Sequence, residues 1–137
     1  MVDVTVDIVK PWVVETKAER HGSFLEVRNV LTSIWRVSLS GKKSYLVPVR
    51  MEIVSRGLFV TYLSNVPDGD GYQPVAKCAA VEAAEECLRE LMERYPDFEP
   101  DASTIARTIE GCVSKRLKGK LGSFATAKVK CGAISTE

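Results

Sequence analysis

The pattern of apolar and polar positions is most regular in the middle of the chain, where three runs rich in β-branched and aromatic residues follow one another. They extend from Ile34 to Ser40, from Ser44 to Val54 and from Gly57 to Leu63. Gly41-Lys42-Lys43 and Ser55-Arg56 separate them, and turns this short join antiparallel neighbours. The pattern therefore predicts a three-stranded antiparallel meander.

The segments before this meander are less regular. Residues 2–8 alternate apolar and polar side chains and predict a half-buried strand or an extended arm. Residues 13–34 are ambiguous, because Ser23 and Glu26 are spaced as the cap and the third residue of a helix. Such a helix would place one apolar stripe on its surface, made of Phe24, Val27, Leu31 and Ile34.

Two amphipathic helices are predicted in the second half. Residues 75–95 have an apolar stripe with spacings of three and four, and Pro96 ends this helix. The stripe consists of Val81, Ala84, Leu88, Leu91 and Tyr95. A second helix begins near Asp101, a good N-cap, and ends in a basic run that contains Gly119. Its predicted buried residues are Ile105, Ile109, Cys112, Val113 and Leu117.

The last segment, from Phe124 to Ile134, predicts a closing strand with Lys128 and Lys130 on one face. Pro48, inside the middle run, marks an edge or a bulge because proline cannot donate to a ladder. Together the elements predict an α+β fold, with the antiparallel meander packed against two or three helices. A length of 137 residues predicts a single domain, residues 1–137.

Composition narrows the class of protein. Asn and Gln total only three residues, a depletion typical of intracellular proteins of hyperthermophiles. No apolar run approaches the ~20 residues that cross a bilayer, and the acidic N-terminus does not resemble a signal peptide. We therefore expect a cytoplasmic protein with no membrane partner.

Catalytic and metal-binding signatures are absent from the sequence. There is no GxGxxG, P-loop, GxSxG or HExxH motif, so we expect neither an enzyme nor a cofactor. The cysteines form no CxxC and the only histidine is His21, which argues against a structural zinc site. The cysteines are therefore interpreted as free buried thiols or as disulfide partners, and they are Cys78, Cys87, Cys112 and Cys131.

Charge is strongly segregated along the chain. Residues 33–64 contain five basic residues against Glu52 alone, whereas residues 65–101 contain ten acidic against three basic residues.

The register of the predicted meander decides which side chains share a face. If Ser55-Arg56 is a two-residue turn, Arg50 pairs with Thr61, and we further assume that Val37 pairs with Val47. One face of the meander is then a core face, made of Val49, Met51, Ile53, Leu58, Val60 and Tyr62. The other face mixes guanidinium groups with an aromatic ring and aliphatic side chains, and it contains Arg36, Ser38, Leu46, Arg50, Phe59, Thr61 and Leu63.

Basic groups beside an aromatic ring suit a protein that binds single strands without sequence preference. Phosphates would be neutralised by Arg36, Lys42, Lys43, Arg50 and Arg56, and Phe59 would stack on bases. Trp35 and Tyr62 fall on the core face and would stack only in a shifted register. The basic end of the second helix either extends this patch or stabilises its own helix end, and it supplies Lys115, Arg116, Lys118 and Lys120.

The chain resembles the ThermoDBP-related single-stranded DNA-binding proteins of hyperthermophilic archaea. The resemblance lies in Ile34-Trp35-Arg36-Val37-Ser38 through Phe59-Val60-Thr61-Tyr62, in the order of the elements and in the scarcity of amides. It implies a fold unrelated to the OB barrel, and in some members DNA passes between subunits. The C-terminal leucine zipper of founding members has no counterpart in this sequence.

These observations predict a sequence-independent binder of single-stranded DNA, or of RNA. Apolar residues on both faces of the meander, among them Leu46 and Leu63, further predict a homo-dimer or homo-tetramer. An oligomeric structural or protein-interaction module without a nucleic-acid role is the alternative. A small enzyme built from dispersed acids such as Glu52 and Asp70 is the second rival.

Overall fold

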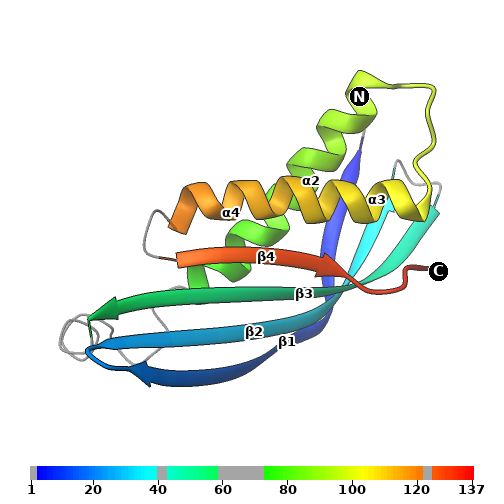
Figure 1. The fold of residues 1–137 in the computed structure, drawn as a ribbon. Helices are drawn as coiled ribbons and strands as arrows, with labels where there is room; N and C mark the ends of the chain where they lie inside the picture. The colour runs from blue at the N-terminus through cyan, green and yellow to red at the C-terminus, as the bar shows by residue number, and fades with distance from the viewer. Residues whose placement is uncertain (1–2, 40–42, 59–72, 122–124) are drawn as a thin grey trace.

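A computed structural model describes residues 3–39, 43–58, 73–121 and 125–137. The described part is an antiparallel sheet of five strands with helices on one face, as Figure 1 shows. The elements in chain order are β1 (Val4–His21), β2 (Phe24–Leu39), β3 (Lys43–Leu58), α2 (Gln73–Arg94), α3 (Ala102–Thr108), the π-helical segment η2 (Ile109–Val113), α4 (Ser114–Leu121), β4 (Ala125–Cys131) and β5 (Ser135–Thr136). The predicted α+β class is confirmed, and the sheet is open rather than a closed barrel.

β1 and β2 form a long hairpin, so the helix considered for residues 13–34 is wrong. The turn at Gly22 and Ser23 brings His21 opposite Phe24, and Gly22 adopts a φ of +63° that favours glycine. In β2 every second residue is buried from Asn29 to Leu39, which is the strand period and not the helical one. The strand predicted at residues 2–8 is confirmed in part as the start of β1, with Val4 and Val6 buried.

β3 runs without interruption through Ser55-Arg56, so the predicted turn there is wrong. Ser55 pairs with Val27 of β2 on one side and with Ala125 of β4 on the other. β2 is long enough to pair with all of β3, and this pairing keeps the segment extended. Arg50 accordingly pairs with Thr32 and Lys130 instead of Thr61. The rest of the predicted third strand, residues 59–63, lies outside the described residues.

The meander is therefore β1-β2-β3, and its register differs from the assumed one by two residues. Val37 lies opposite Tyr45, and Trp35 lies opposite Val47. Because a shift of two residues preserves the faces of a strand, the predicted core residues Val49, Met51 and Ile53 are indeed buried.

Pro48, for which the sequence predicted an edge or a bulge, lies at a gap in the pairing on one side of β3. The β3–β4 pairing ends at Val49, and the β3–β5 pairing begins at Leu46. Between them Gly132 donates its N–H to the carbonyl oxygen of Pro48 at 2.8 Å, and proline has no N–H to return. A Cβ on Gly132 would lie 3.1 Å from Cβ of Pro48, so the close approach favours glycine.

The helical layer packs on the sheet through small and aliphatic side chains. In α2 the buried face is mainly a row of alanines with Leu88, whereas Tyr95 of the predicted stripe is exposed. The alanines on that face are Ala76, Ala80, Ala83 and Ala84. The second helix begins at its predicted cap, since Asp101 accepts a hydrogen bond from the Thr104 N–H at 2.8 Å. It continues past Gly119 to Leu121, which corrects its predicted end.

Predicted buried positions of the second helix are confirmed at Ile105, Ile109, Val113 and Leu117, while Cys112 is half-buried. The closing strand β4 is shorter than predicted, and Lys128 and Lys130 share its exposed face as expected.

Side chains of the helices bind backbone N–H groups on the outer edge of β4 and at the start of β1. On β4, the N–H of Val129 donates to Oγ of Ser114 at 3.0 Å, and the N–H of Cys131 donates to Glu110 at 2.9 Å. At the start of β1, the N–H of Val6 donates to Glu85 of α2 at 2.9 Å. These bonds satisfy backbone donors that would otherwise lie open to another strand.

The two helices are also joined covalently. Cys87 of α2 and Cys112 of η2 form a disulfide. Of the two interpretations of the cysteines, free thiols or disulfide partners, the second is therefore correct for this pair. Cys78 and Cys131 are free, and burial raises the pKa of the Cys131 thiol to about 12.

Reduction of this disulfide should destabilise the protein. The bond closes a loop with a sequence separation of 25, for which the unfolded-state entropy model gives about 3.5 kcal/mol. We expect reductant to lower the free energy of unfolding of the wild type by about this amount in denaturant titrations. Cys78→Ala should respond to reductant as the wild type does, and a Cys87→Ala/Cys112→Ala variant should not respond. Unfolding of the wild type that is insensitive to reductant would contradict the role of the bond.

Candidate functional site

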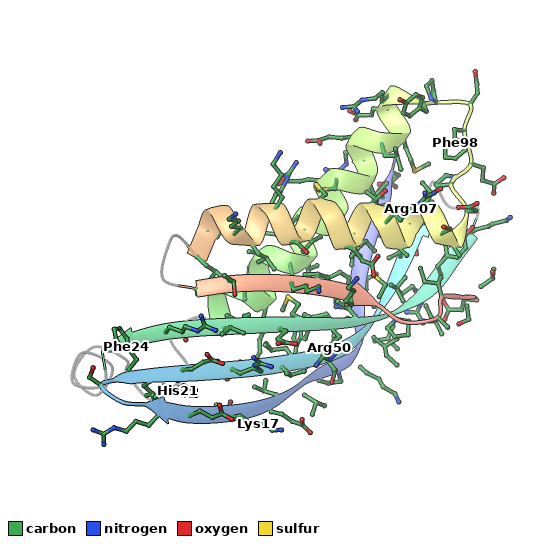
Figure 2. The ribbon with its side chains drawn as sticks, in the orientation of Figure 1. Lys17, His21, Phe24, Arg50, Phe98 and Arg107 are labelled. Atoms are coloured by element: carbon green, nitrogen blue, oxygen red, sulfur yellow. A yellow bond between two sulfur atoms is a disulfide. The ribbon has the colours of Figure 1, made fainter. Side chains whose placement is uncertain are left out.

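The sheet face opposite the helices, here called the open face, carries most of the charged strand residues. A concave region of about 500 Å³ lies on it, across β1, β2 and β3. Figure 2 labels Lys17 and Arg50, two of the residues that line it. Its lining residues are Val13, Glu15, Lys17, Glu19, Glu26, Arg28, Val30, Thr32, Arg50 and Glu52. Strand alternation places all of them on this face, because their neighbours in the sequence point to the opposite face of the sheet.

Arg36 lies on the open face as predicted, but its guanidinium group already binds the carboxylate of Glu137. Nε and Nη2 of Arg36 donate to the two carboxylate oxygens of Glu137 at 2.6 and 2.7 Å. These hydrogen bonds and the Arg36 charge lower the pKa of Glu137. The pair joins the last residue of the sequence to the C-terminal part of β2.

Arg50 and Arg56 also lie on the open face, within a chain of ion pairs. Glu26 accepts from Arg56 at 2.7 Å and lies 3.5 Å from Arg28. Glu52 lies 3.3 Å from Arg28 and 3.2 Å from Arg50. The hydrogen bond from Arg56, helped by the charges of Arg56 and Arg28, lowers the pKa of Glu26.

One part of the open face, formed by β2, β3 and β4, has more basic than acidic side chains. It extends across the sheet from Glu26 on β2 to Lys130 on β4. Arg50 lies directly opposite Lys130, which places like charges on neighbouring strands at a cost in stability. The basic residues of this part, here called the basic strip, are Arg28, Arg50, Arg56, Lys128 and Lys130, and its carboxylates are Glu26 and Glu52. A bound anion would relieve the repulsion.

The basic strip ends beside the aromatic ring of Phe24. The sequence pattern had placed this residue on the apolar stripe of a helix. Phe24 is 53% exposed at the turn end of β2. It lines a hollow of about 360 Å³ together with His21, Leu25, Glu26 and Arg56. The Gly22-Ser23 turn signal between two alternating runs would have placed Phe24 at a hairpin end, had those runs been taken as strands.

An apolar hollow lies near the bend of β1 at the other end of the strip. Register shifts around Lys10 and Val13 bend the strand there. The hollow measures about 450 Å³, and its lining includes Val13, Ile34 and Pro48 with Lys10 and Arg50 as cations.

Several predicted site residues lie elsewhere or are not described. Trp35 is fully buried and meets Trp12 edge to face at 5.8 Å between ring centroids, so it cannot stack on a base. Lys43 pairs with Glu99 at 3.3 Å, on the helix side of the sheet. Lys42, Phe59 and Tyr62 lie outside the described residues, and their roles stay predictions.

The basic end of the second helix does not extend the open face. α4 packs on the opposite face of the sheet, and Arg116 binds Glu86 and Glu90 of α2. Lys115, Lys118 and Lys120 lie on the helical layer. Of the two alternatives for this helix end, extension of the basic patch is therefore wrong.

Among the described residues no group of His, Cys, Asp and Glu could hold a metal ion, and no helix combines the length and apolarity needed to span a bilayer. Comparison with known proteins finds no matching family model, no matching curated protein and no matching solved structure. The geometry of the open face is therefore the basis for assigning a function.

The Arg36–Glu137 pair makes stability depend on pH in a defined direction. Because the folded pKa of Glu137 lies below its ordinary value of 4.5, the pair stabilises the fold above that value and loses its effect as the pH falls through the lowered pKa. We expect Glu137→Gln to have a lower Tm than the wild type at pH 7. The difference should vanish in acid, which circular dichroism melting curves from pH 7 to pH 2 would show. A difference independent of pH would exclude the ion pair as its cause.

Proposed function

We propose that this protein binds single-stranded nucleic acid, DNA or RNA, without sequence preference along its open face. The supporting observation is the basic strip, in which basic residues exceed carboxylates and which leads to the exposed ring of Phe24. The proposed mechanism requires neither catalysis nor a cofactor. It accords with the resemblance to the ThermoDBP-related proteins, and a homo-oligomer in the cytoplasm belongs to the same proposal.

Phosphates would bind the cations of the basic strip. The arginine side chains of the existing ion pairs are exposed, with Arg28, Arg50 and Arg56 47%, 51% and 72% accessible, whereas their partners Glu26 and Glu52 are 16% and 25% accessible. A guanidinium group has five N–H donors, so each exposed arginine can bind a phosphate while it keeps its carboxylate partner. The release of counterions from the nucleic acid then favours binding and makes it salt-dependent.

Bases would contact the two ends of the strip. Phe24 offers a ring beside Arg56, and a stacked base contributes about 1–3 kcal/mol whatever its identity. The apolar hollow at Ile34 and Pro48 offers a second surface for a base. Lys10 and Arg50 line the same hollow and would bind the adjoining phosphates. A duplex keeps its bases stacked inside and presents none to these positions.

A protein-interaction module is the second candidate, because opposite charges already pair across the open face. Such a face suits a protein partner with charges of both signs. This candidate predicts no salt-dependent binding of oligo-dT, whereas the nucleic-acid proposal requires it.

The proposal predicts tighter binding to single strands than to duplex and a salt dependence that Arg50 helps to set. Anisotropy titrations of labelled oligo-dT and of a duplex of equal length, at several salt concentrations, measure both. We expect Arg50→Ala to reduce the slope of log affinity against log salt by ~0.7.

Arg107→Ala, which removes an arginine of the helical layer, is the matched control and should leave the slope unchanged (Figure 2). Equal affinity for duplex and single strand would exclude base contacts. A slope that neither variant changes would show that the open face is structural.

Removal of the Phe24 ring should weaken binding without changing the salt slope, because no counterion release is lost. We expect Phe24→Ala to cost about 1–3 kcal/mol of binding free energy, or roughly 5- to 150-fold in affinity. Phe98→Ala is the matched control, since Phe98 is 47% exposed on the linker between α2 and α3. Both variants should melt as the wild type does. Equal affinities of Phe24→Ala and the wild type would remove Phe24 from the site.

A further inference from the structure

The second half of β1 is a sheet edge that no other strand covers within the described residues. β1 pairs with β2 alone, and no backbone hydrogen bond from the described elements reaches the outer side of Val14, Thr16 or Ala18. This contrasts with the outer edge of β4 and with the start of β1, where side chains from the helices bind backbone N–H groups.

The hairpin geometry shows which backbone groups face outward here. His21 and Phe24 close a two-residue turn, and a closing pair of this kind exchanges both of its hydrogen bonds. Hydrogen-bonded pairs then alternate along the ladder, so Lys17 and Glu15 are bonded to β2 while Val14, Thr16 and Ala18 direct N–H and C=O away from it. The short contact between Thr16 Oγ1 and Asn29 Oδ1, 2.6 Å, fits a non-hydrogen-bonded pair, in which side chains lie closer.

We propose that a second copy of this chain pairs with this edge, antiparallel to it, about a two-fold axis at Thr16. The outward N–H and C=O of Thr16 then bond to the same groups of Thr16 in the second copy. Val14 lies opposite Ala18 of the second copy, and the same pair repeats by symmetry. An antiparallel strand pair about a two-fold axis is self-complementary, as a dimer interface must be.

Charge complementarity selects the second copy as the occupant and sets the register. With the axis at Thr16, Glu15 lies opposite Lys17 of the second copy, twice, and opposite charges in this position stabilise strand pairing. Within the described residues neither Glu15 nor Lys17 has an ion pair of its own, so both are available. An axis at Ala18 would instead direct Lys17 to Glu19, which already lies 3.3 Å from His21.

This pairing would join two sheets into one and bring two open faces together. The concave region lined by Lys17 and Arg28 would continue across the axis into the same region of the second copy. A single strand bound along one open face would then meet the cations of both copies. The dimer itself does not rest on the proposed nucleic-acid function, and its test measures assembly without any oligonucleotide.

Sedimentation equilibrium of the full chain at micromolar to tens of micromolar concentration tests this interface. We expect the wild type to be a dimer. We expect Lys17→Glu to raise the dissociation constant by about tenfold or more, because the introduced carboxylate would face Glu15 of the second copy twice. Glu15→Lys/Lys17→Glu restores opposite charges and should restore the dimer. Lys118→Glu, with the same change of charge on the helical layer, is the control and should dimerise as the wild type does.

Thr16→Pro gives a test that does not depend on charge. Residue 16 uses its N–H only for the second copy, so proline removes that donor without removing a bond to β2, and the variant should be monomeric with a wild-type circular dichroism spectrum. A monomeric wild type at tens of micromolar would overturn the proposal. Dimers of undiminished strength in both Lys17→Glu and Thr16→Pro would place the interface elsewhere. Failure of the double variant to restore the dimer would overturn the register at Thr16.

Discussion

β2 pairs along its whole length with β1 on one side and with β3 on the other, and the other elements are arranged around this double pairing. Because each residue of a strand points opposite to its neighbours, the pairing assigns Leu31, Trp35 and Val37 to the helical side and Arg28, Thr32 and Arg36 to the open side. The same alternation creates the core and the charged face together. A substitution that shifted the register by one residue would exchange them.

The helices cover only one face of the sheet, and they also protect its edges. Small residues on α2 allow close approach to the strands, while Glu85 binds the edge of β1. The second helix presents Glu110 and Ser114, four residues apart, to the N–H groups of β4. The π-helical segment lies at this point and also contains Cys112, whose disulfide with Cys87 joins the two helices. Residues 110–114 therefore contain both the side chains that bind the edge of β4 and the cysteine that links the two helices.

The open face combines features that usually belong to different kinds of surface. Its ion pairs are those of a solvated sheet, but Arg50 faces Lys130 and Lys17 faces Arg28 across strand pairs. Like charges held opposite each other need a counter-charge, and Glu26 and Glu52 are each shared between two arginines. Phosphates would supply further counter-charge, since the side chains of Arg28, Arg50 and Arg56 are exposed. The exposed Phe24 at the end of this row adds a contact that a purely structural face does not need.

The sequence by itself determined the α+β class, α2, the Asp101 cap, most of the buried face of the second helix and the sides on which Arg36, Arg50 and Met51 lie. These features depend on local periodicity and capping, which neighbouring residues specify. Only the tertiary structure decided that Ser55-Arg56 continues a strand, because β2 and β4 pair with that segment from both sides. It also decided the strand state of residues 13–34, where a helical stripe and a strand pattern overlap, because β1 pairs with β2 and β2 pairs with β3. The ion pairs of Arg36, Arg56 and Arg116 and the partner of Cys87 join residues 25 to 101 positions apart in the chain. No local pattern encodes such distances, so the chemistry of the open face emerges only when the strands are aligned.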